Sequence, residues 1–133
     1  MSVNCNISKL IPIGCEIRCA DNSGAKWLRV IGFLGSQGTR KRRLSGGVGS
    51  VAVVTVTSGP AELKSKVRYA LIIRQKYPYT RKVGSIRGKV KFEDNAGILL
   101  GTNKEVLKSV VKGVIARQVT LKKKYSELNG VYR

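Results

Sequence analysis

The sequence contains no histidine and only seven acidic residues, against 26 lysines and arginines, in a chain of 133 residues. Without histidine, the commonest general acid or base of enzymes is missing. The carboxylates of Asp21, Glu93 and Asp94 fall in turn-forming stretches, whereas a two-metal nuclease needs several carboxylates that converge. We therefore expect no catalytic residues and no enzyme. An RNA-processing enzyme that uses these three acids is the alternative.

Cysteine is scarce as well, with three residues. A structural zinc site needs four Cys or His ligands, so no metal ion is expected. On a predicted strand, Cys15 and Cys19 would lie about 13 Å apart, too far for a disulfide or a shared metal. The glycine-rich stretch SGGVGS at 45–50 lacks the Gly-Lys-Ser/Thr ending of a phosphate loop. We expect free thiols and no cofactor.

Long hydrophobic runs are also missing. No stretch of about 18 apolar residues exists, so nothing is expected to span a bilayer. No long helix with a basic face opposite an apolar face is predicted, which argues against a membrane partner. The first ten residues show no basic start followed by an apolar core, so we expect no secretory signal and a cytoplasmic location.

What the sequence does contain is positive charge. The net charge is +19, and 42% of the residues are apolar, enough to form a hydrophobic core. So much charge of one sign repels itself in a small protein. Phosphates bound by such a surface release their condensed counterions, which favours nucleic acid as the partner.

Short β-branched and apolar runs alternate with glycine-rich turns, which is typical of an all-β barrel or sandwich. We predict a mainly β fold: a small, closed, five-stranded barrel with a projecting β-ribbon. The strands are expected at 14–19, 26–33, 48–57, 67–74, 89–92 and 96–100.

The strand at 26–33 carries apolar side chains on both faces. Leu28 and Val30 alternate with Trp27, Ile31 and Phe33. This pattern predicts that part of the strand is covered on both sides.

The C-terminal part changes character from about residue 103. Thr102-Asn103 is a candidate N-cap for a helix over 104–111, and the spacing of Leu121, Tyr125 and Leu128 favours a helix over 119–129. No composition shift marks a domain boundary. We therefore predict one domain over 1–133 that ends in short helices from about 103 onward.

Two segments are strongly basic. Residues 38–47 read GTRKRRLSGG, and residues 74–91 read RQKYPYTRKVGSIRGKVK, a candidate β-ribbon with two tyrosines. Basic and aromatic residues together suit RNA, because cations bind phosphates and rings stack on unpaired bases. A solvated basic surface and a free single-strand-binding barrel are the alternatives. The candidate RNA-binding residues are Lys26, Arg29, Arg40, Lys41, Arg42, Arg43, Lys64, Lys66, Arg68, Arg74, Lys76, Arg81, Lys82, Arg87 and Lys89.

Four short motifs occur in a fixed order along the chain. They are ADNSGA at 20–25, GGVG at 46–49, LIIRQK at 71–76 and FEDNAG at 92–97. The ordered set resembles the universal large-subunit ribosomal protein fourteen family from about Leu10 to about Gln118. The forms LIPIGCEIRCADN and FEDNAG resemble its eukaryotic branch.

The resemblance implies a small β-barrel with a β-ribbon at about Lys76 to Lys91 and a helical C-terminal region. It implies a structural protein near the intersubunit face of the large subunit, assembled in the nucleus and active in cytoplasmic ribosomes. The implied partners are large-subunit ribosomal RNA, neighbouring ribosomal proteins, small-subunit ribosomal RNA through a bridge, and an anti-association factor. The chain departs from the family pattern at 83–84, 113–115, 118 and 120–133.

Overall fold

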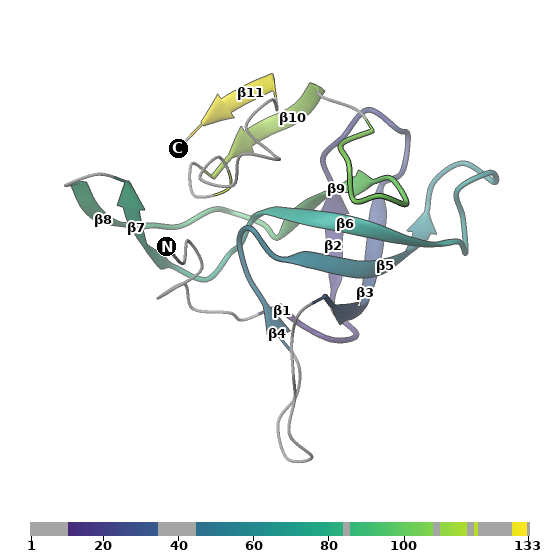
Figure 1. Ribbon diagram of the computed structural model, residues 1–133, viewed down its shortest axis with the longest axis horizontal. Coiled ribbons are helices and arrows are strands. Elements are labelled where there is room, and N and C mark those ends of the chain that lie inside the picture. The colour runs from purple at the N-terminus through teal and green to yellow at the C-terminus, as the bar shows by residue number, and fades with distance from the viewer. Residues whose placement is uncertain are drawn as a thin grey trace, which may run out of the picture.

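Five strands form the centre of the molecule. The computed structural model describes residues 11–34, 45–83, 86–107, 110–116, 119 and 129–132. Within it, a closed barrel has the strand order β2-β3-β5-β6-β9 (Figure 1). The predicted five-stranded barrel is therefore confirmed. The barrel strands are β2 Glu16–Cys19, β3 Trp27–Phe33, β5 Val51–Ser58, β6 Val67–Arg74 and β9 Ala96–Leu100.

Three two-stranded sheets lie around the barrel in the described part of the chain. The antiparallel pair β7-β8 forms the predicted ribbon, which projects from the barrel in Figure 1. The pair β10-β11 is parallel and lies over one side of the barrel. The pair β1-β4 is antiparallel and was not predicted. The bounds are β1 Ile11–Pro12, β4 Ser45–Gly46, β7 Tyr79–Val83, β8 Ile86–Val90, β10 Val110–Ile115 and β11 Asn129–Tyr132.

The barrel closes through β9. This strand pairs antiparallel with β6 and parallel with β2, where Arg18 lies opposite Ala96 and Cys19 lies opposite Gly97. A Cβ atom at Gly97 would lie 3.1 Å from the carbonyl oxygen of Leu71 and equally close to Ile17. Glycine at this position therefore permits the close packing of strands at the closure.

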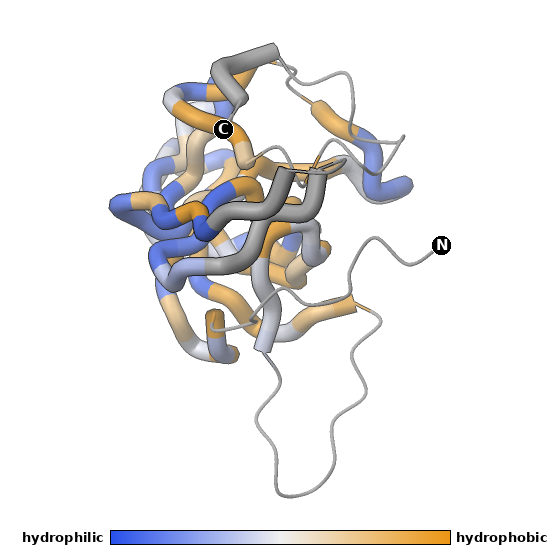
Figure 2. The backbone as a smooth tube through the Cα atoms, turned by 90° about the vertical axis from the view of Figure 1, so that its left-hand side faces the viewer, coloured by the Kyte–Doolittle hydropathy of each residue, from blue (hydrophilic) through white to orange (hydrophobic). Residues whose placement is uncertain are grey.

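Two hydrophobic clusters stabilise the fold, one on each face of β6 and β9. Leu28, Val54 and Ile72 belong to the first cluster, formed by alternate residues of the barrel strands. Leu71 and Ile115 belong to the second, in which β6 and β9 pack against β10. Figure 2 shows hydrophobic stretches of backbone through the middle of the molecule and hydrophilic stretches at several of its outer bends. The strands covered on both sides are thus β6 and β9.

The prediction that part of β3 is covered on both sides was wrong. Trp27 and Ile31 are 39% and 45% exposed, whereas Phe33 is buried. The pairing register with β5 shifts between Val30 and Gly32, because Ile31 is an extra residue in β3. Such a bulge reverses the alternation of faces beyond it. Phe33 therefore points into the core although sequence alternation places it outside.

The predicted helix over 104–111 was also wrong. Val110 begins the strand β10 instead. The backbone of β10 and of the residue after it bonds to other elements: Lys112 N donates to the carbonyl oxygen of Ala20, and Ala116 N donates to that of Ile73. These tertiary hydrogen bonds override the local helical pattern. For the second predicted helix, residues 120–128 lie outside the described residues, and Asn129 begins β11 instead of ending a helix.

Gly46 provides a test of packing between β4 and the barrel. A Cβ atom there would lie 2.3 Å from Cε1 of Phe33. We expect Gly46→Ala to lower the free energy of unfolding by about 1–3 kcal/mol because the ring must move in a packed core. Urea unfolding measures this change. Gly32→Ala is the matched control, because no described atom lies within 4 Å of its added Cβ. Equal losses in both variants would contradict the packing argument.

Candidate nucleic-acid interface

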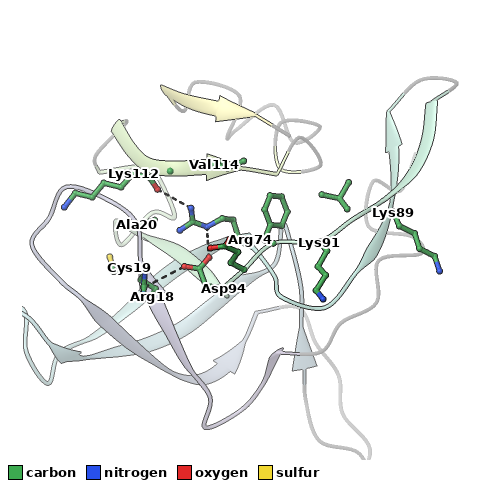
Figure 3. Close-up of a pocket in the computed structure, with 13 residues that line it drawn as sticks. Arg18, Cys19, Ala20, Arg74, Lys89, Lys91, Asp94, Lys112 and Val114 are labelled. Carbon is green, nitrogen blue, oxygen red and sulfur yellow. Dashed lines mark hydrogen bonds and ion pairs between the residues drawn. The ribbon is translucent and has the colours of Figure 1, made fainter.

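A basic cleft opens beside the barrel. Its volume is about 1060 Å³, and it lies between β2, the end of β6, the base of the ribbon and β10 (Figure 3). Glu93 and Asp94 are the acidic residues in its lining. Clefts lined mainly by one sign of charge concentrate the electrostatic field and attract the opposite charge. The basic lining residues are Arg18, Arg74, Lys89, Lys91 and Lys112.

Asp94 links two of these cations. Its carboxylate lies 3.2 Å from Nε of Arg74, an ion pair without an aligned hydrogen bond, and 3.8 Å from Nε of Arg18. The Arg74 side chain is only 12% exposed, whereas that of Arg18 is well exposed. Asp94 therefore neutralises the inner part of the cleft and leaves the positive charge on its rim.

Arg74 also joins the barrel to β10. Its Nη1 donates a hydrogen bond of 3.4 Å to the carbonyl oxygen of Lys112. The guanidinium lies against Gly113, where a Cβ atom would come within 2.3 Å of Nη1. Gly113 has φ +85°, a conformation that favours glycine. The geometry makes Arg74 a positioning residue on the floor of the cleft.

An exposed aromatic residue lies next to the cleft. The guanidinium of Arg18 lies 5.4 Å from the ring centroid of Trp27, within cation–π range. On the same outer face, Arg29 pairs with Glu16 at 3.2 Å. The outer face of β2 and β3 therefore carries a partly exposed ring among cations.

The predicted site residues do not all meet at one site. Arg74 and Lys89 line the basic cleft, and Lys76 lines a smaller cavity near it. Lys26 and Arg29 are exposed on the β2–β3 side. Arg40, Lys41, Arg42 and Arg43 lie outside the described residues, and Arg81, Lys82 and Arg87 are placed on the ribbon by their backbone alone.

Two other predicted residues, Lys66 and Arg68, line a different hollow beside β6, and Lys64 lies nearby in sequence without lining it. Lys64 and Lys66 are exposed on the turn between β5 and β6, and Arg68 is half-buried at the start of β6. Within the part of the chain that the structure describes, Nε of Arg68 has no hydrogen-bond partner. These residues form a second basic surface away from the cleft.

Sequence reasoning missed Arg18, Lys91 and Lys112. The outward position of Arg18 on an alternating strand and the place of Lys91 in the basic segment 74–91 were available signals. Lys112 had none, because it follows the predicted helix over 104–111 and belongs to no predicted element. Its position follows from the pairing of β10 with the turn after β2.

Known proteins are similar to this sequence over most of its length. The family described as Ribosomal protein L14p/L23e matches residues 10–129. The chain belongs to this family. "Large ribosomal subunit protein uL14" of Thermoplasma volcanium is 42% identical over 108 residues, which cover 81% of this chain and 80% of the relative. The protein of that name from Nitrosopumilus maritimus is 43% identical over 116 residues, covering 87% and 81%.

In this member of the L14p/L23e family, the turn of the ADNSGA motif contains a buried carboxylate. Asp21 is 1% exposed. Its Oδ1 accepts hydrogen bonds from Ser23 N, Ser23 Oγ and Cys19 Sγ at 3.1, 2.6 and 3.0 Å, and its Oδ2 accepts one from Leu99 N at 2.9 Å. Asp21 therefore joins the β2–β3 turn to β9 and has a structural role.

The two described cysteines are free thiols. Burial, together with the hydrogen bond to Asp21, raises the pKa of Cys19 to about 12. Burial and the nearby charge of Glu16 raise the pKa of Cys15. Both groups stay protonated near neutral pH, whereas a nucleophile or metal ligand has to be a thiolate.

Other chemistry has no support among the residues that the structure describes. No three His, Cys, Asp or Glu side chains there are grouped so that they can hold a metal ion. No helix in the described ranges has the length and apolar character needed to cross a membrane. The described geometry supports a binding surface.

Proposed function

We propose that this protein is a structural constituent of the large ribosomal subunit and binds large-subunit ribosomal RNA. The match to the Ribosomal protein L14p/L23e family over residues 10–129 carries this proposal. Relatives named "Large ribosomal subunit protein uL14" support it. The protein acts by binding and is not an enzyme.

The mechanism is electrostatic and geometric. Lys89, Lys91 and Lys112 neutralise phosphates along the basic cleft, and bound counterions leave the RNA. Arg74 and Asp94 hold the walls of the cleft in place. A closed barrel provides a rigid frame, so the bound RNA is held in one geometry.

The wider set of contacts is also a proposal. Arg40 to Arg43 in the basic segment 38–47, and Arg81, Lys82 and Arg87 in the ribbon, extend the RNA-binding surface because of their charge. Position near the intersubunit face, a bridge to small-subunit RNA, the anti-association factor and nuclear assembly rest on the family resemblance. They remain predictions.

The salt dependence of RNA binding tests the electrostatic mechanism. For about eight phosphate contacts we expect the logarithm of the association constant to fall against the logarithm of salt concentration with a slope of roughly −6 to −7. The fluorescence of Trp27, the single tryptophan, reports binding of purified large-subunit ribosomal RNA. A slope near zero would contradict the mechanism. Sedimentation of the cellular protein apart from large subunits and their precursors would instead favour a free RNA-binding module.

A further inference from the structure

A second cavity lies where β6 leads into the ribbon. Its volume is about 470 Å³, within the usual range for small-ligand sites. Ile11 and Pro78 give it apolar walls, Tyr77 contributes an aromatic ring, and Lys76 and Lys91 contribute positive charge. The described lining contains no acidic residue. The cavity therefore combines a ring, apolar surface and cations.

The backbone that carries Tyr77 is held on both sides. Gln75 is 1% exposed, its Oε1 accepts a 2.9 Å hydrogen bond from Val48 N, and its Nε2 donates a 3.0 Å bond to the carbonyl oxygen of Tyr77. The next amide, Lys76 N, donates a 2.7 Å bond to Oδ1 of Asn95. The Tyr77 side chain is nevertheless among the exposed large side chains, with the residue 50% exposed. An exposed ring on a fixed backbone loses little entropy when it binds.

Asn95 adds a directional polar group. Its side-chain oxygen is used by the amide of Lys76, so its NH₂ group is left as a donor beside the cavity. A nucleobase offers ring nitrogens and carbonyl oxygens that accept such hydrogen bonds. The cavity thus provides both a stacking surface and a hydrogen-bond donor.

Lys91 connects this cavity to the basic cleft, because it lines both. An RNA backbone that follows the cleft therefore stays beside positively charged side chains until it reaches the cavity. The apolar walls also suit a segment of a neighbouring protein. The described lining, however, has two lysines and no acidic residue to neutralise them, which suits a ligand that carries a phosphate. Charge complementarity favours a nucleotide.

We propose that this cavity binds one unpaired nucleotide of RNA. The base stacks on Tyr77 and accepts a hydrogen bond from Asn95, and its phosphate lies between Lys76 and Lys91. This inference rests on the proposed RNA-binding function and deepens it: the protein recognises an RNA in which a base has left the helical stack. The cavity is then a specific subsite within a mainly electrostatic interface.

Three RNA duplexes of equal length test the inference with the full chain. One is fully paired, one has a single bulged adenosine, and one has an abasic bulge at the same position. We expect the bulged adenosine to bind between about 5- and 150-fold more tightly than the other two, the range that stacking of one base provides. Fluorescence anisotropy of labelled RNA measures the three affinities.

Three variants locate the preference. Tyr77→Ala should abolish it, and Tyr77→Phe should keep it because the ring remains. Asn95→Asp should reduce it, because the bond to Lys76 N is kept while the donor is lost and a negative charge is added beside the two lysines. Both Tyr77 variants should retain the salt slope of the unmodified protein, and an unchanged urea midpoint for Tyr77→Ala will show that the fold is intact.

The outcomes separate the two proposals. Equal affinity for all three RNAs with a normal salt slope would overturn the nucleotide site and leave the RNA-binding function standing. A preference that survives Tyr77→Ala would also overturn it. No salt-dependent binding to any RNA would instead refute the proposed function itself.

Discussion

Replacing Asp21 with alanine will lower the free energy of unfolding by about 3–5 kcal/mol. The substitution leaves the amide of Leu99 and the donors of the turn without their acceptor in a buried place. Each buried donor without a partner costs about 1–3 kcal/mol, and bonds to a charged acceptor are stronger than neutral ones. Urea unfolding at neutral pH measures the loss.

Two further variants define the cause. Asp21→Asn keeps the shape but turns an NH₂ group toward one of the donors, so we expect a smaller, still clear loss of about 1–3 kcal/mol. Glu93→Ala removes an exposed carboxylate and should change stability by less than about 0.5 kcal/mol. If Asp21→Ala were as stable as Glu93→Ala, the buried carboxylate would have no structural role.

Removing two cations from the basic cleft will weaken RNA binding strongly. For Lys89→Ala combined with Lys112→Ala, we expect affinity in 0.1 M salt to fall by roughly 25- to 60-fold and the salt slope to become shallower by about 1.4–1.8. Both side chains are exposed and line the cleft. Lys91 is left in place because it also lines the smaller cavity. Titration of large-subunit ribosomal RNA at several salt concentrations measures both quantities.

A matched variant separates contact from total charge. Lys64→Ala combined with Lys66→Ala removes the same charge from the exposed turn before β6. If the cleft is the main contact, this variant should lose less than about fivefold in affinity, because separated surface charges are largely screened at this salt concentration. Equal losses in the two double variants would mean that the charge of the whole chain, and not the cleft, determines binding.

Strands with strong local signals could be predicted from the sequence. The bounds of β6 and β9 agree with the predicted 67–74 and 96–100. Both strands are apolar runs enclosed between charged or glycine-containing segments, so their ends are visible. β1 and β4 have two residues each, too few to show any periodicity. The bulge at Ile31 and the strand nature of β10 depend on partners far away in the sequence.

The candidate site was less accessible to sequence reasoning. Charge density indicates a polyanion, and the ribbon could be placed from its basic and aromatic composition. Which cations converge depends on the fold, since Arg18 and Lys112 reach one cleft from distant parts of the chain. Arg74, predicted to contact phosphate, pairs with Asp94 and lies against Gly113. Burial of that kind is invisible in a list of basic residues.

The closure of the barrel through β9 also determines how the chain folds. Strands β3, β5 and β6 pair with strands that are close in sequence, so they can form early. In contrast, β9 has to enter between β6 and β2, and the residues of β2 lie about eighty positions before those of β9. Such non-local pairing slows folding to the millisecond-to-second range. Until β9 arrives, β2 and β6 each expose an unpaired edge, a template for aggregation. The slow step of folding and the period of greatest risk therefore end together, when Ala96–Leu100 enters the barrel.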